Sequence, residues 1–126
     1  MIRLAPVDFL KVQSWFQDYQ KKSKNFEMPP EEAQLVGIYR GESLIGYFIL
    51  VHYLQPQILE INQGYLEPSS RHKNLSKISM ELLEVEAKKV GVKKIMLSTN
   101  RAVGSYIKFM RNMNYGISKA IFCKEL

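Results

Sequence analysis

The segment from Tyr65 to Ser76, which reads YLEPSSRHKNLS, constrains the possible fold of this chain more than any other. A strand-like run ends in a turn marked by Pro68, and a basic polar loop then leads into an amphipathic helix. The first N–H groups of a helix lack intrahelical partners, so they point together at one spot that suits a phosphate. The segment therefore predicts a strand, an anion-binding loop and a helix in succession.

Size and composition are those of a small globular protein. With 126 residues, of which 46% are hydrophobic and 24% charged, the chain is expected to form one domain over residues 1–126. The longest mainly apolar run, Leu44 to Leu54, is too short to span a bilayer, and no secretory leader pattern opens the sequence. Cys123 is the sole cysteine, which excludes an internal disulfide. We therefore expect a cytoplasmic protein without a membrane partner.

The chain is basic, with a formal net charge of +6. Such a charge favours polyanions, which include nucleic acids and smaller phosphate-bearing molecules. The basic residues are spread along the chain, and none of their groups is the dense Arg/Lys block with interleaved aromatic residues that nucleic-acid binders use. Nucleic-acid binding is therefore the least favoured function, and a steep salt dependence of affinity would be needed to support it.

Hydrophobic periodicity divides the chain into strands and helices in the order β-α-β-β-β-α-β-α-β. A meander that feeds a helical crossover predicts a mixed sheet of the α/β class. The expected strands are Met1–Leu4, Leu35–Tyr39, Leu44–Tyr53, Ile58–Leu66, Val92–Ser98 and Ile117–Leu126, and the expected helices are Pro6–Lys22, Leu75–Val90 and one that carries Tyr106 to Met113.

The frame from Arg71 to Ser76 resembles the coenzyme A pyrophosphate loop of the GNAT superfamily of N-acetyltransferases, whose signature is Arg/Gln-x-x-Gly-x-Gly/Ala. Asn74 and Ser76 stand in the two glycine positions. Asparagine tolerates a positive φ, and serine is small and can donate to a phosphate oxygen. Residues 41–51, 91–97 and 109–115 are similar to further GNAT segments in the same order. The resemblance implies the GNAT-like acyl-CoA N-acyltransferase fold, with acetyl-CoA in a split between the fourth and fifth strands.

The resemblance also implies which residues hold acetyl-CoA as the co-substrate. Backbone groups of Gly64, Tyr65 and Leu66 would pair with the pantetheine arm. No metal is implied, and a basic helix cap without a ligand is the alternative for the loop. The pyrophosphate would be held by Arg71, His72, Lys73, Asn74, Leu75, Ser76 and Lys77.

The family's chemistry is the direct transfer of an acyl group from a thioester to an amine acceptor. Glu60 lies five residues before Tyr65, where histone-type members keep a general base, and the alternative is a partly exposed strand carboxylate. Met110 takes the place of the tyrosine thought to protonate the thiolate, and a thioether cannot donate that proton. Tyr106, one helical turn earlier, is the candidate acid, with a core or surface role as the alternative. His52 could act as an acid or a base, but a single histidine on a strand is more often a packed or an exposed residue.

The end of the chain departs from the family pattern. Only ten residues follow Gly116, which is enough for one strand where the family has a hairpin that often lines the acceptor cleft. We therefore expect an acceptor site that is open or is completed by a second subunit, in a homodimer or with a protein partner.

Two functions follow from these features. The first is an acetyl-CoA-dependent N-acyltransferase that acts on an amine acceptor. The alternative is a catalytically degenerate GNAT fold that serves as a binding or assembly module, similar to compact versions carried by some bacteriophages. The lost glycines, Met110 and the short C-terminus favour this alternative. Binding of coenzyme A distinguishes the two.

Overall fold

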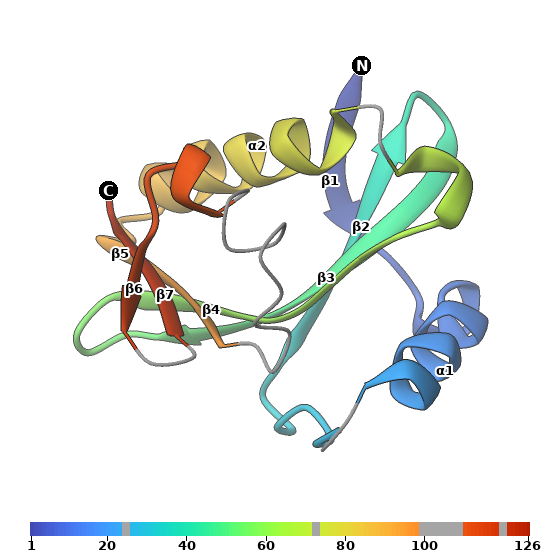
Figure 1. The fold of residues 1–126 in the computed structure, drawn as a ribbon, viewed down its shortest axis with the longest axis horizontal. Helices are drawn as coiled ribbons and strands as arrows, with labels where there is room; N and C mark the ends of the chain where they lie inside the picture. The colour runs from blue at the N-terminus through green and yellow to red at the C-terminus, as the bar shows by residue number, and fades with distance from the viewer. Residues whose placement is uncertain (24–25, 72–73, 99–109, 119–120) are drawn as a thin grey trace.

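The computed structural model describes residues 1–23, 26–71, 74–98, 110–118 and 121–126 (Figure 1). No helix in these ranges is long and apolar enough to cross a membrane. The described helices are α1 (Gln13–Lys22) and α2 (Leu75–Lys89), with the short 3-10 helices η1 (Phe9–Lys11) and η2 (Pro68–Ser70). The described strands are β1 (Ile2–Pro6), β2 (Gln34–Arg40), β3 (Ser43–Tyr53), β4 (Ile58–Leu66), β5 (Lys94–Ser98), β6 (Gly116–Ser118) and β7 (Ile121–Glu125).

These strands form one mixed sheet in the order β1-β2-β3-β4-β5-β7-β6. The strands β1 to β4 are an antiparallel meander, and β4 pairs with β5 in parallel after the crossover through α2. Both β5 and β6 pair antiparallel with β7. The mixed α/β sheet expected from the sequence is confirmed.

The C-terminal segment is a hairpin, so the expectation of a single strand from Ile117 to Leu126 was wrong. Gly116 lies opposite Cys123, and Ser118 lies opposite Ile121. Both strands fit because β6 has only three residues and only residues 119 and 120 separate it from β7. The reason for expecting an open or shared acceptor site is thereby removed.

The first helix begins later than the periodicity predicts. Strand β1 lies at the edge of the sheet and extends through Pro6. Proline has no N–H to donate, and an edge strand tolerates this because the missing donor can face solvent instead of a partner strand. The η1 turn follows, and the carboxylate of Asp8 caps it by accepting the N–H of Leu10 at 3.0 Å. α1 then starts at Gln13.

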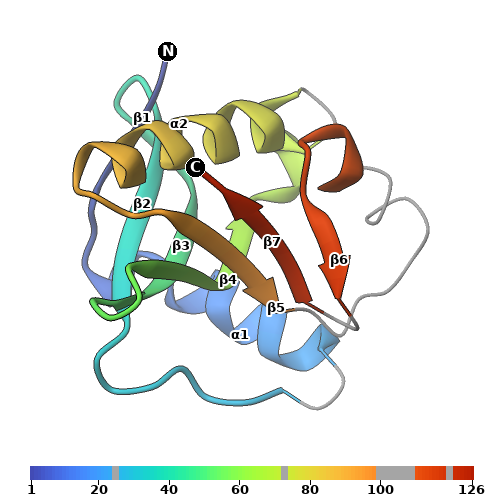
Figure 2. The ribbon, with the colours of Figure 1, turned by 90° about the vertical axis from the view of Figure 1, so that its left-hand side faces the viewer.

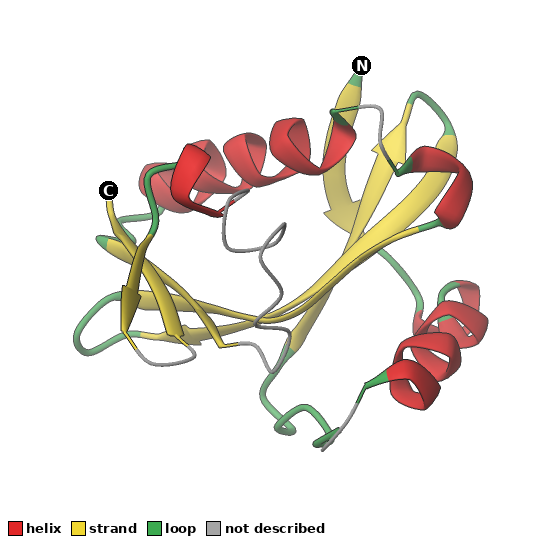
Figure 3. Cartoon of the chain, viewed as in Figure 1, coloured by secondary structure: helices red, strands yellow, loops and turns green. Residues whose placement is uncertain are grey.

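The two helices cover opposite faces of the sheet (Figures 2 and 3). Side chains alternate between the faces along β3, so that Phe48 and Leu50 join the core under α2 while Tyr47 and Ile49 pack with α1. The α2 core is the larger and mainly aliphatic. The α1-side cluster contains the buried residues Val12, Phe16, Tyr47, Ile49 and Tyr65.

β4 is paired with β5 over only the first half of its length. Ile58 to Ile61 pair with Lys94 to Leu97, and the described residues show no pairing with β5 beyond that point. A β-bulge at Asn62 marks the change, because on the other side Ile61 pairs with Leu50 whereas Gln63 pairs with Ile49. Residues 62–66 therefore present an edge that β5 leaves open.

Candidate functional site

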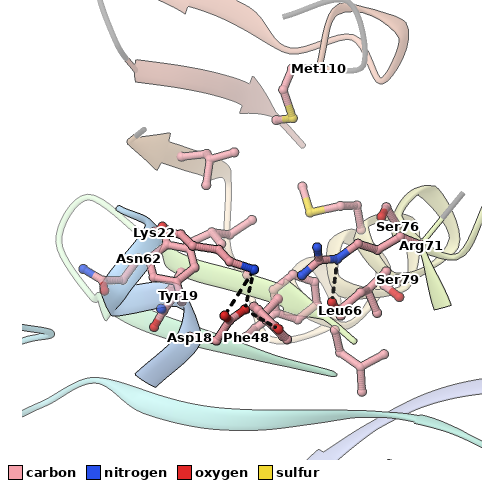
Figure 4. A pocket seen from close by; sticks show the side chains of 17 residues that line it. Asp18, Tyr19, Lys22, Phe48, Asn62, Leu66, Arg71, Ser76, Ser79 and Met110 are labelled. Atoms are coloured by element: carbon pink, nitrogen blue, oxygen red, sulfur yellow. Dashed lines mark hydrogen bonds and ion pairs between the residues drawn. The ribbon is translucent and has the colours of Figure 1, made fainter. Parts of the chain in front are cut away.

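A cavity of about 370 Å³ lies where β4 diverges from β5 (Figure 4). Its walls come from both faces of the sheet. α1 supplies Asp18, Tyr19 and Lys22, and α2 supplies Ser76, Ser79 and Met80. The other described lining residues are Ile38, Phe48, Ile61, Asn62, Gln63, Gly64, Tyr65, Leu66, Arg71, Leu97 and Met110. The described part of the chain contains no cluster of His, Cys, Asp or Glu that could hold a metal ion.

The open edge of β4 supplies backbone groups to this cavity. The carbonyl of Leu66 accepts a hydrogen bond of 2.8 Å from Arg71 Nε, so it points away from β3. Backbone groups alternate in direction along an antiparallel strand, so those of Gly64 point the same way. A Cβ at Gly64 would meet only the Phe48 ring, at an ordinary contact distance of 3.4 Å. Packing therefore admits a Cβ here, and the glycine leaves the α2 face of the strand without a side chain at this point.

The loop before α2 adopts, at Asn74, the left-handed backbone conformation that a glycine or an asparagine can provide. Asn74, in the first glycine position of the GNAT signature, has φ 62° and ψ 10°, in the left-handed region where glycine and asparagine are favoured. Ser76, in the second glycine position, lines the cavity. The other predicted residues of the loop are Leu75, which is buried, Lys77, which is exposed, and His72 and Lys73, which lie outside the described residues.

Arg71 is held at the cavity by two contacts. Besides its bond to Leu66, its guanidinium carbon lies 5.0 Å from the centre of the Tyr65 ring, a cation–π distance. Figure 4 shows its side chain entering from the α2 side and that of Lys22 entering from the α1 side. Two cations thus approach the cavity from opposite faces of the sheet.

Asp18 is the one carboxylate among the described lining residues. It accepts hydrogen bonds from the Tyr65 hydroxyl at 3.0 Å and from Lys22 Nζ, whose closest approach is 3.1 Å. The bonds from Lys22 and Tyr65 hold the pKa of Asp18 below its usual value. Burial, followed by the bond to Asp18, raises the pKa of Tyr65. At neutral pH the pair is therefore an ionised carboxylate and a protonated phenol.

Tyr65 belongs to a stack of three aromatic rings. Its ring centre lies 5.9 Å from that of Trp15 and 5.7 Å from that of Tyr47. Tyr47 is fully buried, burial raises the pKa of its phenol, and its hydroxyl has no hydrogen-bond partner in the described structure. Both polar atoms of the buried Gln63 side chain likewise lack a partner there. The α1 side of β4 therefore combines aromatic packing with unpaired polar atoms.

Glu60, one of the two predicted catalytic residues, lies apart from this polar group. Glu60 is on the paired half of β4, outside the described cavity lining, and accepts a hydrogen bond of 3.0 Å from the Tyr53 hydroxyl. This bond raises the pKa of Tyr53. Tyr106 lies outside the described residues, and His52 is exposed. Met110 is 1% exposed and lines the cavity, so a thioether occupies that part of the wall.

Sequence reasoning missed the α1 side of the cavity. Asp18 and Lys22 are four residues apart on one helix, but such pairs are common on exposed helix surfaces and did not indicate a site. Tyr19 fits the helical periodicity, which gives no sign that it lies at a cavity. Asn62 and Gln63 were missed because a β-bulge has no distinct pattern in this strand's sequence.

Several solved structures resemble this fold over nearly the whole chain. The ribosomal-protein-S18-alanine N-acetyltransferase of Escherichia coli has a TM-score of 0.77 at 11% identity, covering 99% of this chain and 94% of that one. The PaiA N-acetyltransferase of Thermoplasma acidophilum, in complex with coenzyme A, has a TM-score of 0.69 at 16% identity, covering 100% and 99%. A phosphinothricin acetyltransferase of Sinorhizobium meliloti, in complex with AcCoA, has a TM-score of 0.74 at 16% identity, covering 99% and 88%. These similarities establish a shared fold.

The family follows from the sequence itself. No curated protein sequence matched this chain. The sequence model of the Acetyltransferase (GNAT) family matches residues 4–115, a range that contains β4, the loop before α2, α2 itself and β5. This chain therefore belongs to the GNAT acetyltransferase family.

Proposed function

We propose that this protein transfers an acetyl group from acetyl-CoA directly to the nitrogen of an amine acceptor. The observation that carries the proposal is the edge of β4 that faces a cavity of about 370 Å³ beyond the end of the β5 pairing. A chain that contains amide groups can pair with such an edge as an added strand does. The pantetheine arm of coenzyme A is a chain of this kind.

The residues around this edge fit such a ligand. Gly64 leaves room beside the strand, and Leu66 offers a carbonyl that points away from β3. The diphosphate would lie at the start of α2, where Ser76 lines the cavity and the first N–H groups of the helix lack intrahelical partners. Arg71 adds positive charge, and the predicted residues His72 and Lys73 would add more. The coenzyme complexes of PaiA and of the phosphinothricin acetyltransferase, which share this fold, support the proposal.

The acceptor would enter from the α1 side, past Asp18 and Lys22. Its nitrogen would bond to the thioester carbonyl carbon, the carbon–sulfur bond would break, and the sulfur would take up a proton. The backbone N–H of Gly64 would stabilise charge on the carbonyl oxygen. Glu60 stays the proposed base, and because it lies outside the described lining it would act through water. Tyr106 stays the proposed acid.

Calorimetry with acetyl-CoA tests the binding step in two variants. Gly64→Val adds a branched side chain to the α2 face of β4 beside the cavity, where its Cβ would lie 3.4 Å from the Phe48 ring. We expect at least about a tenfold loss of affinity, and circular dichroism checks that the fold is retained. Ser76→Asp places a negative charge in the first turn of α2. It should stabilise the helix by about 0.3–1 kcal/mol and yet weaken binding of the diphosphate. Ser14→Asp, at the same position of α1, is the matched control and should leave acetyl-CoA affinity unchanged.

Release of free thiol in the presence of primary amines tests the transfer step. Thiol release that depends on the amine supports the enzyme. Binding of acetyl-CoA without thiol release would instead identify a GNAT fold that binds without catalysing, which agrees with the thioether of Met110 in the cavity wall. Failure to bind acetyl-CoA at millimolar concentration would refute the proposal.

A further inference from the structure

The strand edge that would bind pantetheine is occupied by the protein's own side chain. Arg71 Nε donates a 2.8 Å hydrogen bond to the Leu66 carbonyl, and both residues line the cavity. The bond is charge-assisted, which makes it stronger than a neutral one. An amide N–H of a ligand that pairs with this carbonyl must therefore displace the guanidinium.

A fixed aromatic platform holds the guanidinium in this position. Its carbon lies 5.0 Å from the centre of the Tyr65 ring, and Tyr65 is in turn stacked with Trp15 and Tyr47. The hydroxyl of Tyr65 donates to Asp18 at 3.0 Å, which fixes the other end of the ring. The platform therefore favours the position of Arg71 on the strand edge as long as no stronger partner is present.

The positive charge of Arg71 interacts electrostatically with Asp18 and Tyr65 on the α1 side of the cavity. It contributes to lowering the pKa of Asp18, after the larger effects of Lys22 and Tyr65, and it partly opposes the rise in the pKa of Tyr65. The guanidinium thus stands between the backbone edge on the α2 side and the polar side chains on the α1 side. A movement of Arg71 would alter both at once.

We propose that Arg71 is a specificity-determining residue that caps the β4 edge until a diphosphate draws it away. The proposal rests on the proposed binding of acetyl-CoA. A diphosphate at the start of α2 offers the guanidinium two anionic groups, and the planar fork of arginine donors matches phosphate oxygens. Release of Arg71 then frees the Leu66 carbonyl for the pantetheine arm. The phosphate-bearing thioester is thereby preferred over a thioester that carries pantetheine alone.

The substitution Arg71→Met tests this cap, because it keeps an unbranched side chain over Tyr65 and removes every donor. The ligands are coenzyme A and D-pantetheine, and their affinities are measured by calorimetry and by titration of backbone amide NMR signals. We expect about a tenfold loss of affinity for coenzyme A and a gain of up to about tenfold for pantetheine. Lys22→Met is the matched control, because Lys22 also lines the cavity but bonds to Asp18 and not to the strand. It should produce no gain for pantetheine.

The expected loss of affinity for coenzyme A and gain for pantetheine distinguish the role of Arg71 from the acetyl-CoA binding on which it rests. An unchanged or weaker affinity of Arg71→Met for pantetheine overturns the cap, and so does an affinity that is undetectable in both proteins, since the freed carbonyl would then contribute nothing. In either case binding of coenzyme A by the unaltered protein leaves the proposed function standing. Absence of coenzyme A binding by the unaltered protein overturns both.

Discussion

The two faces of the sheet contribute to the cavity by different means. On the α2 face the wall consists of the backbone edge of β4, the start of a helix and aliphatic side chains. On the α1 face it consists of the polar groups of Asp18, Lys22 and Tyr65, which are fixed by hydrogen bonds and by stacked aromatic rings. One side of the site is therefore made by backbone geometry and the other by side-chain chemistry.

This difference governs how each side responds to a change of sequence. Asn74 and Ser76 replace two signature glycines, and Asn74 still adopts the left-handed conformation before α2. A site made of backbone groups can thus survive substitutions that preserve the path of the chain. The bond between Tyr65 and Asp18, which are 47 residues apart, has no such tolerance because it needs both side chains.

The largest effect on stability is expected from Leu83→Ala on the α2 face. Leu83 is 4% exposed in the aliphatic core, and its truncation should cost about 2–5 kcal/mol through lost burial and a residual cavity. Urea unfolding measures the change. Val85→Ala on the same helix, where the side chain is 51% exposed, is the control and should stay within about 0.5 kcal/mol. Equal effects of the two would show that the aliphatic core does not support this face.

A smaller effect, of the opposite sign, is expected from Tyr47→Phe on the α1 face. The variant removes a buried hydroxyl without a described partner and should raise the free energy of unfolding at neutral pH by about 1 kcal/mol. Because burial raises the pKa of Tyr47 above its ordinary value of 10.0, the unfolded chain loses this proton first, so stability is unaffected by the group below that value and falls as the pH rises from there through the folded-state value. Thermal unfolding from pH 8 to about pH 11 should therefore show a shallower alkaline loss in the variant. Identical alkaline profiles would contradict this assignment.

The smallest effect on stability is expected from Asp18→Asn. The folded-state pKa of Asp18 is lowered, so its contribution is present above the ordinary value of 3.8 and disappears as the pH falls through the folded-state value. The variant should therefore be less stable than the unaltered protein at neutral pH and equal to it in strong acid.

The same substitution tests whether the α1 side receives the acceptor. With acetyl-CoA as donor, Asp18→Asn should raise KM for the amine several-fold and leave KM for acetyl-CoA unchanged. Asp8→Asn, which alters the cap of η1, is the control and should not change KM for the amine. A change confined to KM for acetyl-CoA would place Asp18 with the donor and erase the distinction between the two faces.

Much of the fold was predictable because its signals are local. The strand-like run that ends at Pro68 predicted β4, and the periodicity from Leu75 predicted α2, with the basic loop between them. Each of these signals depends only on residues that are neighbours in the sequence. The C-terminal hairpin was not predicted, since a three-residue strand is too short to show a period. The predicted backbone edge at Gly64 and Leu66 lies at the cavity. Glu60 lies outside its described lining, because side chains alternate along a strand and the neighbouring Ile61 is the one that faces the cavity.

The sequence by itself determined the order of strands and helices as far as β5, the family, and the loop from Arg71 that leads into α2. Only the tertiary structure decided that α1 brings Asp18 and Lys22 to the split between β4 and β5, and that Arg71 folds back onto the Leu66 carbonyl. The physical reason is the separation along the sequence of the residues that decide each feature. Backbone conformation and hydrophobic period are fixed by adjacent residues, whereas contacts between polar side chains arise where separate elements meet across a sheet.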